Sequence, residues 1–224
     1  QVETLRSVGI NDIVIVTGYK SEKIKIPNIR YYKNAQYTET NMVASLFSDK
    51  KELHGEILIA YSDIIYEKRV LDIILNSSAD IGVTVDNNYW EYWQARLDNP
   101  EDDIESLIIN KGGNIVKLGT PCGINEAKER YVGLIKLSEN GTKILKTVYE
   151  KNRKLYYASD KPWLGSKSFK QGYMTSLLQA VIDAGHVIRP IVIKRGWLEF
   201  DTAQDYERAV EWAKSGRLRD FIIL

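Results

Sequence analysis

Short apolar runs alternate with amphipathic stretches along the first part of the chain. Residues 12–19, DIVIVTGY, are nearly continuously apolar, as strands buried on both faces are. Similar runs occupy residues 29–34, 56–63 and 79–86, and stretches with helical spacing of apolar positions occupy residues 1–9, 40–53 and 68–77. This alternation of strand and helix predicts an α/β domain with a mostly parallel sheet covered by helices.

The pattern changes after residue 86. Residues 105–119 form two β-like arms around Lys111-Gly112-Gly113-Asn114, which predicts an antiparallel hairpin. A strand at 131–138, helices at 139–153 and 168–184, and strand material at 186–201 that leads into a last helix complete the pattern. With no repeat or linker, we expect one domain over residues 1–224, in which 87–130 form a substrate-binding insertion with a hairpin.

The composition narrows the classes of partner. Thirty-one Lys and Arg against 30 Asp and Glu leave a formal net charge of +1, which removes the usual electrostatic reason to expect nucleic acid or a membrane surface. The single Cys122 excludes an intrachain disulfide, and no apolar run approaches the roughly 20 residues that cross a bilayer. We therefore expect a cytoplasmic protein with a small polar substrate, and the sequence leaves an oligomer open.

Two acids stand at the ends of strands that are distant in sequence. Asp63 ends EILIAYSD and Asp201 ends RGWLEFD, and helical patterns follow both. Ligands of open α/β sheets bind outside the carboxyl ends of the strands, so converging carboxylates there could hold Mg²⁺, which favours oxygen ligands and phosphates. The alternative is that each acid merely caps the helix that follows it.

Taken in order, seven segments resemble a known family over nearly the whole chain: VGINDIVIVTGY, YTETNMVASLF, YSDIIY, WEYWQARLDNPEDDIES, YVGLIKLS, YMTSLLQAVIDAG and WLEFDTAQDYERA. The family is the nucleotidyltransferases that include sugar-1-phosphate nucleotidyltransferases and, closer to this chain, phosphocholine cytidylyltransferases. The resemblance implies a Rossmann-like three-layer sandwich with a mixed, mostly parallel sheet. It also implies that Asp63 and Asp201 are catalytic and bind Mg²⁺.

The chemistry of such a site requires no protein nucleophile. The acceptor phosphate or phosphonate is already anionic, so its oxygen can attack the α-phosphorus of a nucleoside triphosphate, and the enzyme positions the reactants and stabilises charge. Residues that fall where related enzymes approach the nucleotide are Gly18, Tyr19, Asn41, Ser45 and Ser62. A turn at Gly18 and a helix cap at Asn41 explain two of these equally well.

Aromatic and acidic residues gather in the middle of the chain. Trp90, Tyr92 and Trp93 precede Glu105, and this mixture suits a cationic head group held by cation–π contact and carboxylates. The alternative is that the tryptophans form a hydrophobic patch. Further substrate-binding candidates are Glu199, beside Asp201, and Tyr173.

The acceptor is predicted from a departure from the sugar enzymes. Many of these carry a Glu-Lys-Pro motif where this chain has Thr120-Pro121, and the lysine meets the sugar phosphate. Its absence favours a small phosphorylated amino-alcohol, such as phosphocholine, or an aminoalkylphosphonate. We therefore expect transfer of CMP from CTP with release of pyrophosphate.

Family members begin with a strand, a glycine-rich loop and a lysine that would precede Gln1, so we expect an N-terminally incomplete chain with weak turnover. Three alternatives stay open: a sugar-1-phosphate nucleotidyltransferase, a glycosyltransferase, and a non-catalytic regulatory domain that keeps the fold. A glycosyltransferase usually carries Asp-x-Asp, whereas this chain has Ser62-Asp63-Ile64.

Overall fold

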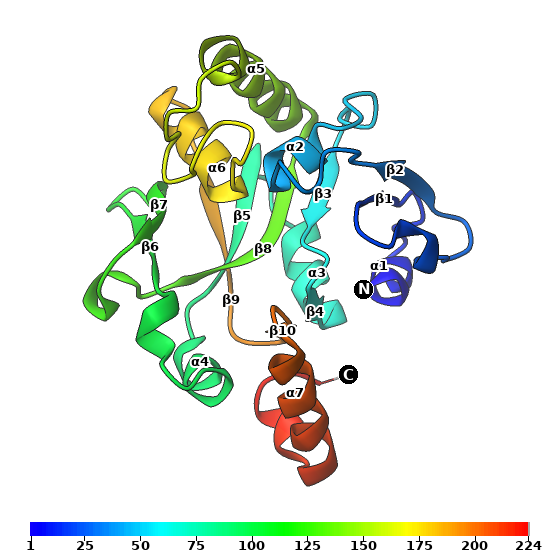
Figure 1. The fold of residues 1–224 in the computed structure, drawn as a ribbon. Coiled ribbons are helices and arrows are strands. Elements are labelled where there is room, and N and C mark those ends of the chain that lie inside the picture. The colour runs from blue at the N-terminus through cyan, green and yellow to red at the C-terminus, as the bar shows by residue number, and fades with distance from the viewer. Residues whose placement is uncertain (224) are drawn as a thin grey trace.

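The computed structural model describes residues 1–223, apart from the side chain of Asn125. Its central sheet has four strands in the order β3-β8-β5-β9 (Figure 1). These strands are β3 (Ile57–Ala60), β8 (Arg130–Leu137), β5 (Ile81–Asp86) and β9 (Arg189–Ile193). β8 is antiparallel to both neighbours and β9 is parallel to β5, so β3, β5 and β9 run in one direction and β8 runs in the other.

The sheet is buried on both faces, which explains the apolar runs of its strands. Every residue of β5 is buried, and successive residues of β8 contribute to different cores: Ile135 to one and Leu134 to the other. Because side chains of a strand alternate between faces, the two cores lie on opposite sides of the sheet. The molecule is therefore a three-layer α/β sandwich, as predicted.

One core is covered by helices and by the predicted hairpin. The covering elements are α2 (Met42–Leu46), α5 (Glu139–Tyr156), α6 (Met174–Asp183), β6 (Glu105–Ile109) and β7 (Ile115–Pro121). β6 and β7 are antiparallel, and β7 packs against α6. The hairpin predicted around residues 111–114 is confirmed.

The other core is covered by four helices from separate parts of the chain. They are α1 (Val2–Ser7), α3 (Lys68–Leu75), α4 (Trp90–Arg96) and α7 (Ala203–Ser215).

The remaining elements are short. The 3-10 turns are η1 (Ser21–Lys23), η2 (Pro100–Asp103), η3 (Ile124–Glu126) and η4 (Arg217–Asp220). β1 (Val14–Thr17) and β2 (Arg30–Lys33) form a separate parallel pair on the far side of β3 (Figure 1).

Two short strands bring distant parts of the chain together. β4 (Ile64–Tyr66) pairs with β10 (Trp197–Glu199) in antiparallel register, with Ile64 opposite Glu199. β4 was not predicted: it is only three residues long and lies directly after Asp63, where the sequence predicted that one strand ends and that a helix follows.

Two predicted helices are shorter than expected. α2 ends at Leu46 rather than at residue 53, since turns follow Phe47, and α6 begins at Met174 rather than at residue 168. In the second case, residues 168–173 form a loop whose backbone carbonyls accept from the amides of Asn41 and Val43. No helix in the described part of the chain is both long and apolar enough to cross a membrane.

Candidate active site

Asp63 and Asp201 converge, because the backbone around them is paired. The amide of Phe200 donates to the carbonyl of Asp63 at 2.8 Å, immediately beyond the pairing of Glu199 with Ile64. The two carboxylates predicted to meet at one sheet edge therefore come from adjacent backbone segments.

The structure excludes the helix-cap alternative for both acids. α3 has Glu67 at its N-cap position, four residues beyond Asp63. α7 has Thr202 as N-cap, whose hydroxyl accepts from the amide of Asp205 in a reciprocal capping box. Since neither Asp63 nor Asp201 caps the following helix, their placement needs another explanation.

The Asp63 carboxylate fits a cation. Its Oδ1 is buried and has no hydrogen-bond partner within the described part of the protein. Burial raises the pKa of this carboxyl, and the neighbouring charge of Asp201 raises it further. A buried acceptor without a partner is costly, and a bound cation would relieve both effects.

The donor set also fits Mg²⁺. Asp63 and Asp201 supply two carboxylates, and across residues 1–223 no three His, Cys, Asp or Glu side chains are grouped to hold a metal ion. Mg²⁺ is commonly bound through one or two carboxylates together with substrate phosphates. Asp63 and Asp201 would hold it.

Arg96, which ends α4, is the main cation beside Asp201. Its side chain is 2% exposed and donates to Glu199 Oε2 at 2.7 Å, to Asp201 Oδ2 at 2.5 Å, and to Asp205 at 2.9 and 3.2 Å. Sequence reasoning did not select this residue as part of the site. The local sequence shows only that Arg96 follows an aromatic run, WEYWQA.

Glu199 lies between these charges. Burial raises the pKa of its carboxyl to about 7, and the Asp201 charge adds to this, whereas Arg130 and Arg96 lower it. Arg130 reaches the same Glu199 oxygen at 3.9 Å. The two arginines therefore partly balance the acids at the end of β10.

Tyr92 and Trp93 lie in the core rather than at an open surface. They are 2% and 0% exposed, and the Tyr92 hydroxyl accepts from the Glu199 amide at 2.9 Å. Arg130 and Arg96 lie over the Trp93 ring, 3.9 and 4.7 Å from its centroid. The placement of Tyr92 and Trp93 therefore disagrees with the expected contact to a cationic substrate. It fits the alternative of a hydrophobic patch, because side chains of the same chain already pack against both rings.

Other substrate candidates remain accessible. Trp90 is half-buried and packs edge-on against Tyr89, and Tyr173 is 40% exposed before α6. Glu105 is accessible, although nearby atoms desolvate it and raise the pKa of its carboxyl. The buried Tyr131 hydroxyl lacks a partner among the described residues and was not predicted.

The nucleotide candidates gather where β1 meets α2. Gly18 lies so close to Tyr37 that a Cβ would come within 2.8 Å of the Tyr37 Cβ, whereas Tyr19 is 67% exposed. Asn41 caps α2 by accepting from the Met42 amide at 2.8 Å. Ser45 accepts from Asn34 at 3.1 Å, so both α2 candidates already have structural partners. Ser62, the remaining candidate, is exposed and adjoins Asp63.

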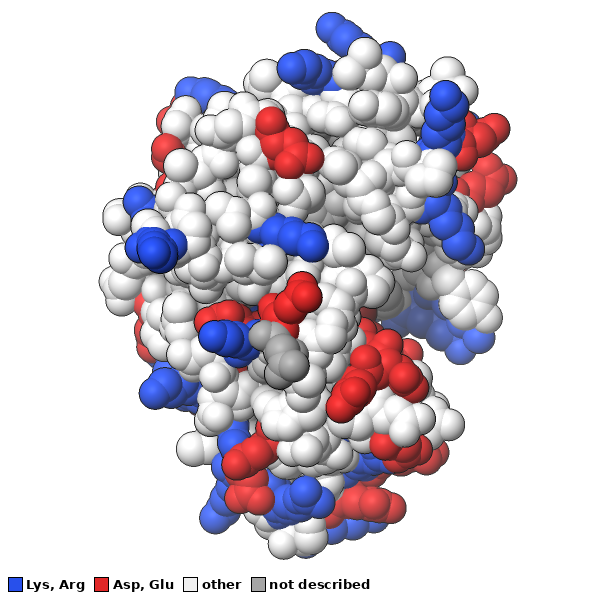
Figure 2. All heavy atoms as spheres, turned by 90° about the vertical axis from the view of Figure 1, so that its left-hand side faces the viewer, with Lys and Arg blue, Asp and Glu red and all other residues white. Residues whose placement is uncertain are grey.

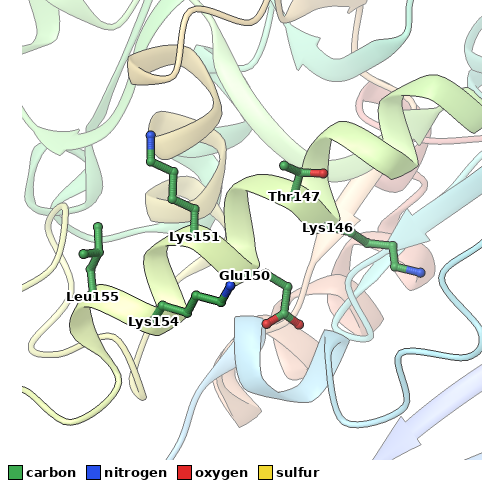
Figure 3. Close-up of a pocket in the computed structure, with 6 residues that line it drawn as sticks. All are labelled: Lys146, Thr147, Glu150, Lys151, Lys154 and Leu155. Carbon is green, nitrogen blue, oxygen red and sulfur yellow. The ribbon is translucent and has the colours of Figure 1, made fainter.

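Two surface hollows are lined by residues other than Asp63 and Asp201. One of about 550 Å³ follows α5 and is lined by residues of that helix alone: Lys146, Thr147, Glu150, Lys151, Lys154 and Leu155 (Figure 3). The other, of about 530 Å³, lies between the α2 region and α5. The surface in Figure 2 shows acidic and basic side chains interspersed, in keeping with the small net charge.

Solved structures define the class of fold. The inositol-1-phosphate CTP transferase of T. maritima matches 99% of this chain and 82% of its own, with a TM-score of 0.65 and 14% identity. The CTP:phosphocholine cytidylyltransferase of Streptococcus pneumoniae matches 95% of this chain and 83% of its own, with a TM-score of 0.68 and 17% identity. The fold is therefore that of the Rossmann-like nucleotidyltransferases, as the sequence predicted.

A curated relative establishes the family, although no family model matches the chain. The chain is 30% identical over 224 residues to the CTP:phosphoglutamine cytidylyltransferase of Campylobacter jejuni subsp. jejuni serotype O:2, covering 94% of this chain and 85% of the relative. The chain belongs to the nucleotidyltransferase family. The family prediction is confirmed, and the non-catalytic alternative is set aside.

Proposed function

We propose that the protein transfers CMP from CTP to a small phosphorylated acceptor that carries an amino group, and that the reaction depends on Mg²⁺. The observation that carries this proposal is the convergence of Asp63 and Asp201, with Asp63 Oδ1 buried and unpaired in the described structure. The similarity to cytidylyltransferases of phosphoglutamine and phosphocholine supports CTP as the donor.

The residues act by positioning and charge. A bound Mg²⁺ supplies neutralisation of the triphosphate and of the leaving pyrophosphate. Asp63 and Asp201 would orient that cation at the ends of paired strands. The anionic oxygen of the acceptor forms the new bond to the α-phosphorus and pyrophosphate leaves with the electrons of the broken bond, so no side-chain base is needed.

The acceptor's amino group is assigned from the acids near this edge. Glu105 is accessible and has no ion-pair partner in the described structure, and its surroundings penalise an unpaired charge, which a primary or quaternary ammonium would relieve. Trp90 is half-buried, unlike Tyr92 and Trp93, and supplies an aromatic surface that a substrate can reach. Of the predicted substrate-binding residues, Trp90, Glu105 and Tyr173 are the accessible ones and remain the candidates for contact with the acceptor.

Pyrophosphate release tests the proposal. CTP and UTP are paired with phosphocholine, phosphoethanolamine, 2-aminoethylphosphonate, an amino-acid phosphate and glucose 1-phosphate, each with Mg²⁺ or with EDTA. We expect CTP and an amino-bearing acceptor to give the highest kcat/KM, and EDTA to abolish it. Preference for glucose 1-phosphate would support the sugar-1-phosphate alternative and contradict the proposed acceptor.

Substitution tests the acids. Asp63→Asn and Asp201→Asn should each lower kcat by about 100-fold or more while the protein stays folded. Asp72→Asn is the matched control, because Asp72 pairs only with exposed Lys68 on α3, and its kcat should stay at the wild-type value. Wild-type kcat in Asp63→Asn would refute the metal site.

A further inference from the structure

Arg96 joins three carboxylates that have different functions. Asp205 belongs to the capping box of α7, Glu199 ends β10, and Asp201 is one of the two acids proposed to bind the cation. The guanidinium has five N–H donors in a fixed fork, and four contacts to these acids use that geometry. A lysine could not make the same set of bonds.

The contact with Asp205 is the fixed part of this arrangement. Asp205 is buried, and Arg96 binds both of its oxygens through Nε and Nη2. Asp205 Oδ2 also accepts from the backbone amides of Asp201 and Thr202. The guanidinium is thus attached to the start of α7 independently of any ligand.

Asp201 is the adjustable part. Its side chain is 48% exposed, and Arg96 holds Oδ2 only. An exposed carboxylate without this bond would sample several rotamers. With Oδ2 held, the carboxylate has one preferred orientation, and Oδ1 is left for another ligand.

The Arg96 guanidinium packs over the Trp93 ring. Trp93 lies three residues earlier on α4, fully buried, with the guanidinium carbon 4.7 Å from its ring centroid. Residues three apart on a helix are neighbours, so the spacing itself brings the two side chains together. Cation–π attraction to the ring favours this position of the guanidinium.

We propose that Arg96 is a positioning residue: it orients Asp201 toward Asp63 and prevents a cation from settling between Asp201 and Glu199. The inference rests on the proposed Mg²⁺-dependent function. In this role Arg96 touches neither nucleotide nor acceptor, and it acts through the carboxylate that it holds. It occupies the space between Asp201 and Glu199 that a divalent ion would otherwise share.

The test separates metal affinity from turnover. Mn²⁺ is the probe, and its binding to the protein without nucleotide is measured by electron paramagnetic resonance, alongside kcat and thermal unfolding. In Arg96→Met the positive charge is lost, so Mn²⁺ should bind at least about threefold more tightly while kcat falls about 10- to 100-fold. A merely structural defect would weaken both binding and turnover.

Arg96→Lys keeps the charge but lacks the fork. We expect its Mn²⁺ affinity to stay within about twofold of wild type and its kcat to fall about 10-fold or more, with a changed Mn²⁺ spectrum. This variant keeps the test decisive if Arg96→Met does not fold. Arg208→Lys, on α7 and paired with Asp98 at the surface, is the control and should match wild type in every measurement.

Asp205→Asn weakens the contact that anchors the guanidinium, but it leaves the Arg96 charge and the bonds to Glu199 and Asp201. It should lower the unfolding temperature and change kcat and the Mn²⁺ spectrum in the same direction as Arg96→Lys, but less. If Arg96→Lys behaves like Arg208→Lys, the positioning role is refuted. Failure of the proposed function gives a different result: wild type would then bind Mn²⁺ no better than Asp63→Asn.

Discussion

Replacement of Asp86 by alanine should destabilise the whole fold by about 3 kcal/mol. Asp86 ends β5 with 0% exposure. Its Oδ2 accepts from the Trp197 indole at 2.8 Å, and its Oδ1 accepts from the amides of Asn88 and Arg195 at 2.8 and 3.1 Å. The carboxylate therefore joins the central sheet to the strand that leads into Glu199.

The magnitude follows from the three donors that lose their acceptor. A buried donor left unpaired costs about 1–3 kcal/mol, and the Trp197 indole, 1% exposed, should fall in that range. Asn88 is exposed and Arg195 partly so, which lets water compensate in part, so each of these amides should cost about 0.5–1 kcal/mol. A loss of about 3 kcal/mol corresponds to a fall in Tm of about 6–12 °C for a chain of this size.

Urea unfolding followed by tryptophan fluorescence measures this loss. Asp80→Ala is the control, because Asp80 immediately precedes the same strand and also accepts two hydrogen bonds, from Ser138 and Asn140, but is exposed. The control should lose less than about 1 kcal/mol. Equal losses in the two variants, or a loss below about 1 kcal/mol in Asp86→Ala, would refute the argument from burial.

Three further outcomes are expected. Gly133→Ala should lower stability by about 2–4 kcal/mol in thermal unfolding, since Gly133 has φ +84° and a Cβ would lie 2.8 Å from Tyr61 Cγ. Thr202→Ala should lower the free energy of unfolding in urea by about 1 kcal/mol, because it removes the acceptor for the Asp205 amide, whereas Thr202→Ser keeps a hydroxyl acceptor and should lose less. Hydrogen bonds from Ser138 and Asn140 hold the pKa of Asp80 below its usual value. The contribution of Asp80 to the stability of the fold should therefore be present above about pH 4 and be lost as the pH falls through the pKa of the folded state. Asp80→Asn should lack that pH dependence, and an identical dependence in the variant would contradict the assignment.

The sequence predicted the elements whose burial is continuous. β5 and β8 are buried on both faces, so their apolar runs are unambiguous, and α5 shows regular helical spacing over 18 residues. β4 has only three residues, and it is a strand because β10 pairs with it from a distant part of the chain. Local pattern cannot predict an element whose stability depends on such a partner.

The same distinction applies to the candidate site. Asp63 and Asp201 could be singled out because each follows a predicted strand, but the contact between their segments depends on the pairing of β4 with β10, which the local pattern does not reveal. Arg96 could not be predicted, because its partners Glu199, Asp201 and Asp205 lie more than 100 positions away. A buried arginine is identified by the acids around it, and the local sequence contains none of the three.

The residue types that bind cations could be predicted from the sequence, but the cations that they bind in the structure could not. Trp93 and Glu199 do hold cations, as their chemistry predicts, but the cations are Arg96 and Arg130 of the same chain. Any substrate ammonium must therefore bind where the chain has not already supplied a guanidinium. Among the predicted residues, Glu105 and Trp90 remain accessible, and Glu105 is not ion-paired in the described structure. Acceptor specificity should consequently respond to Glu105→Gln through KM, whereas substitution of Trp93 should act on stability.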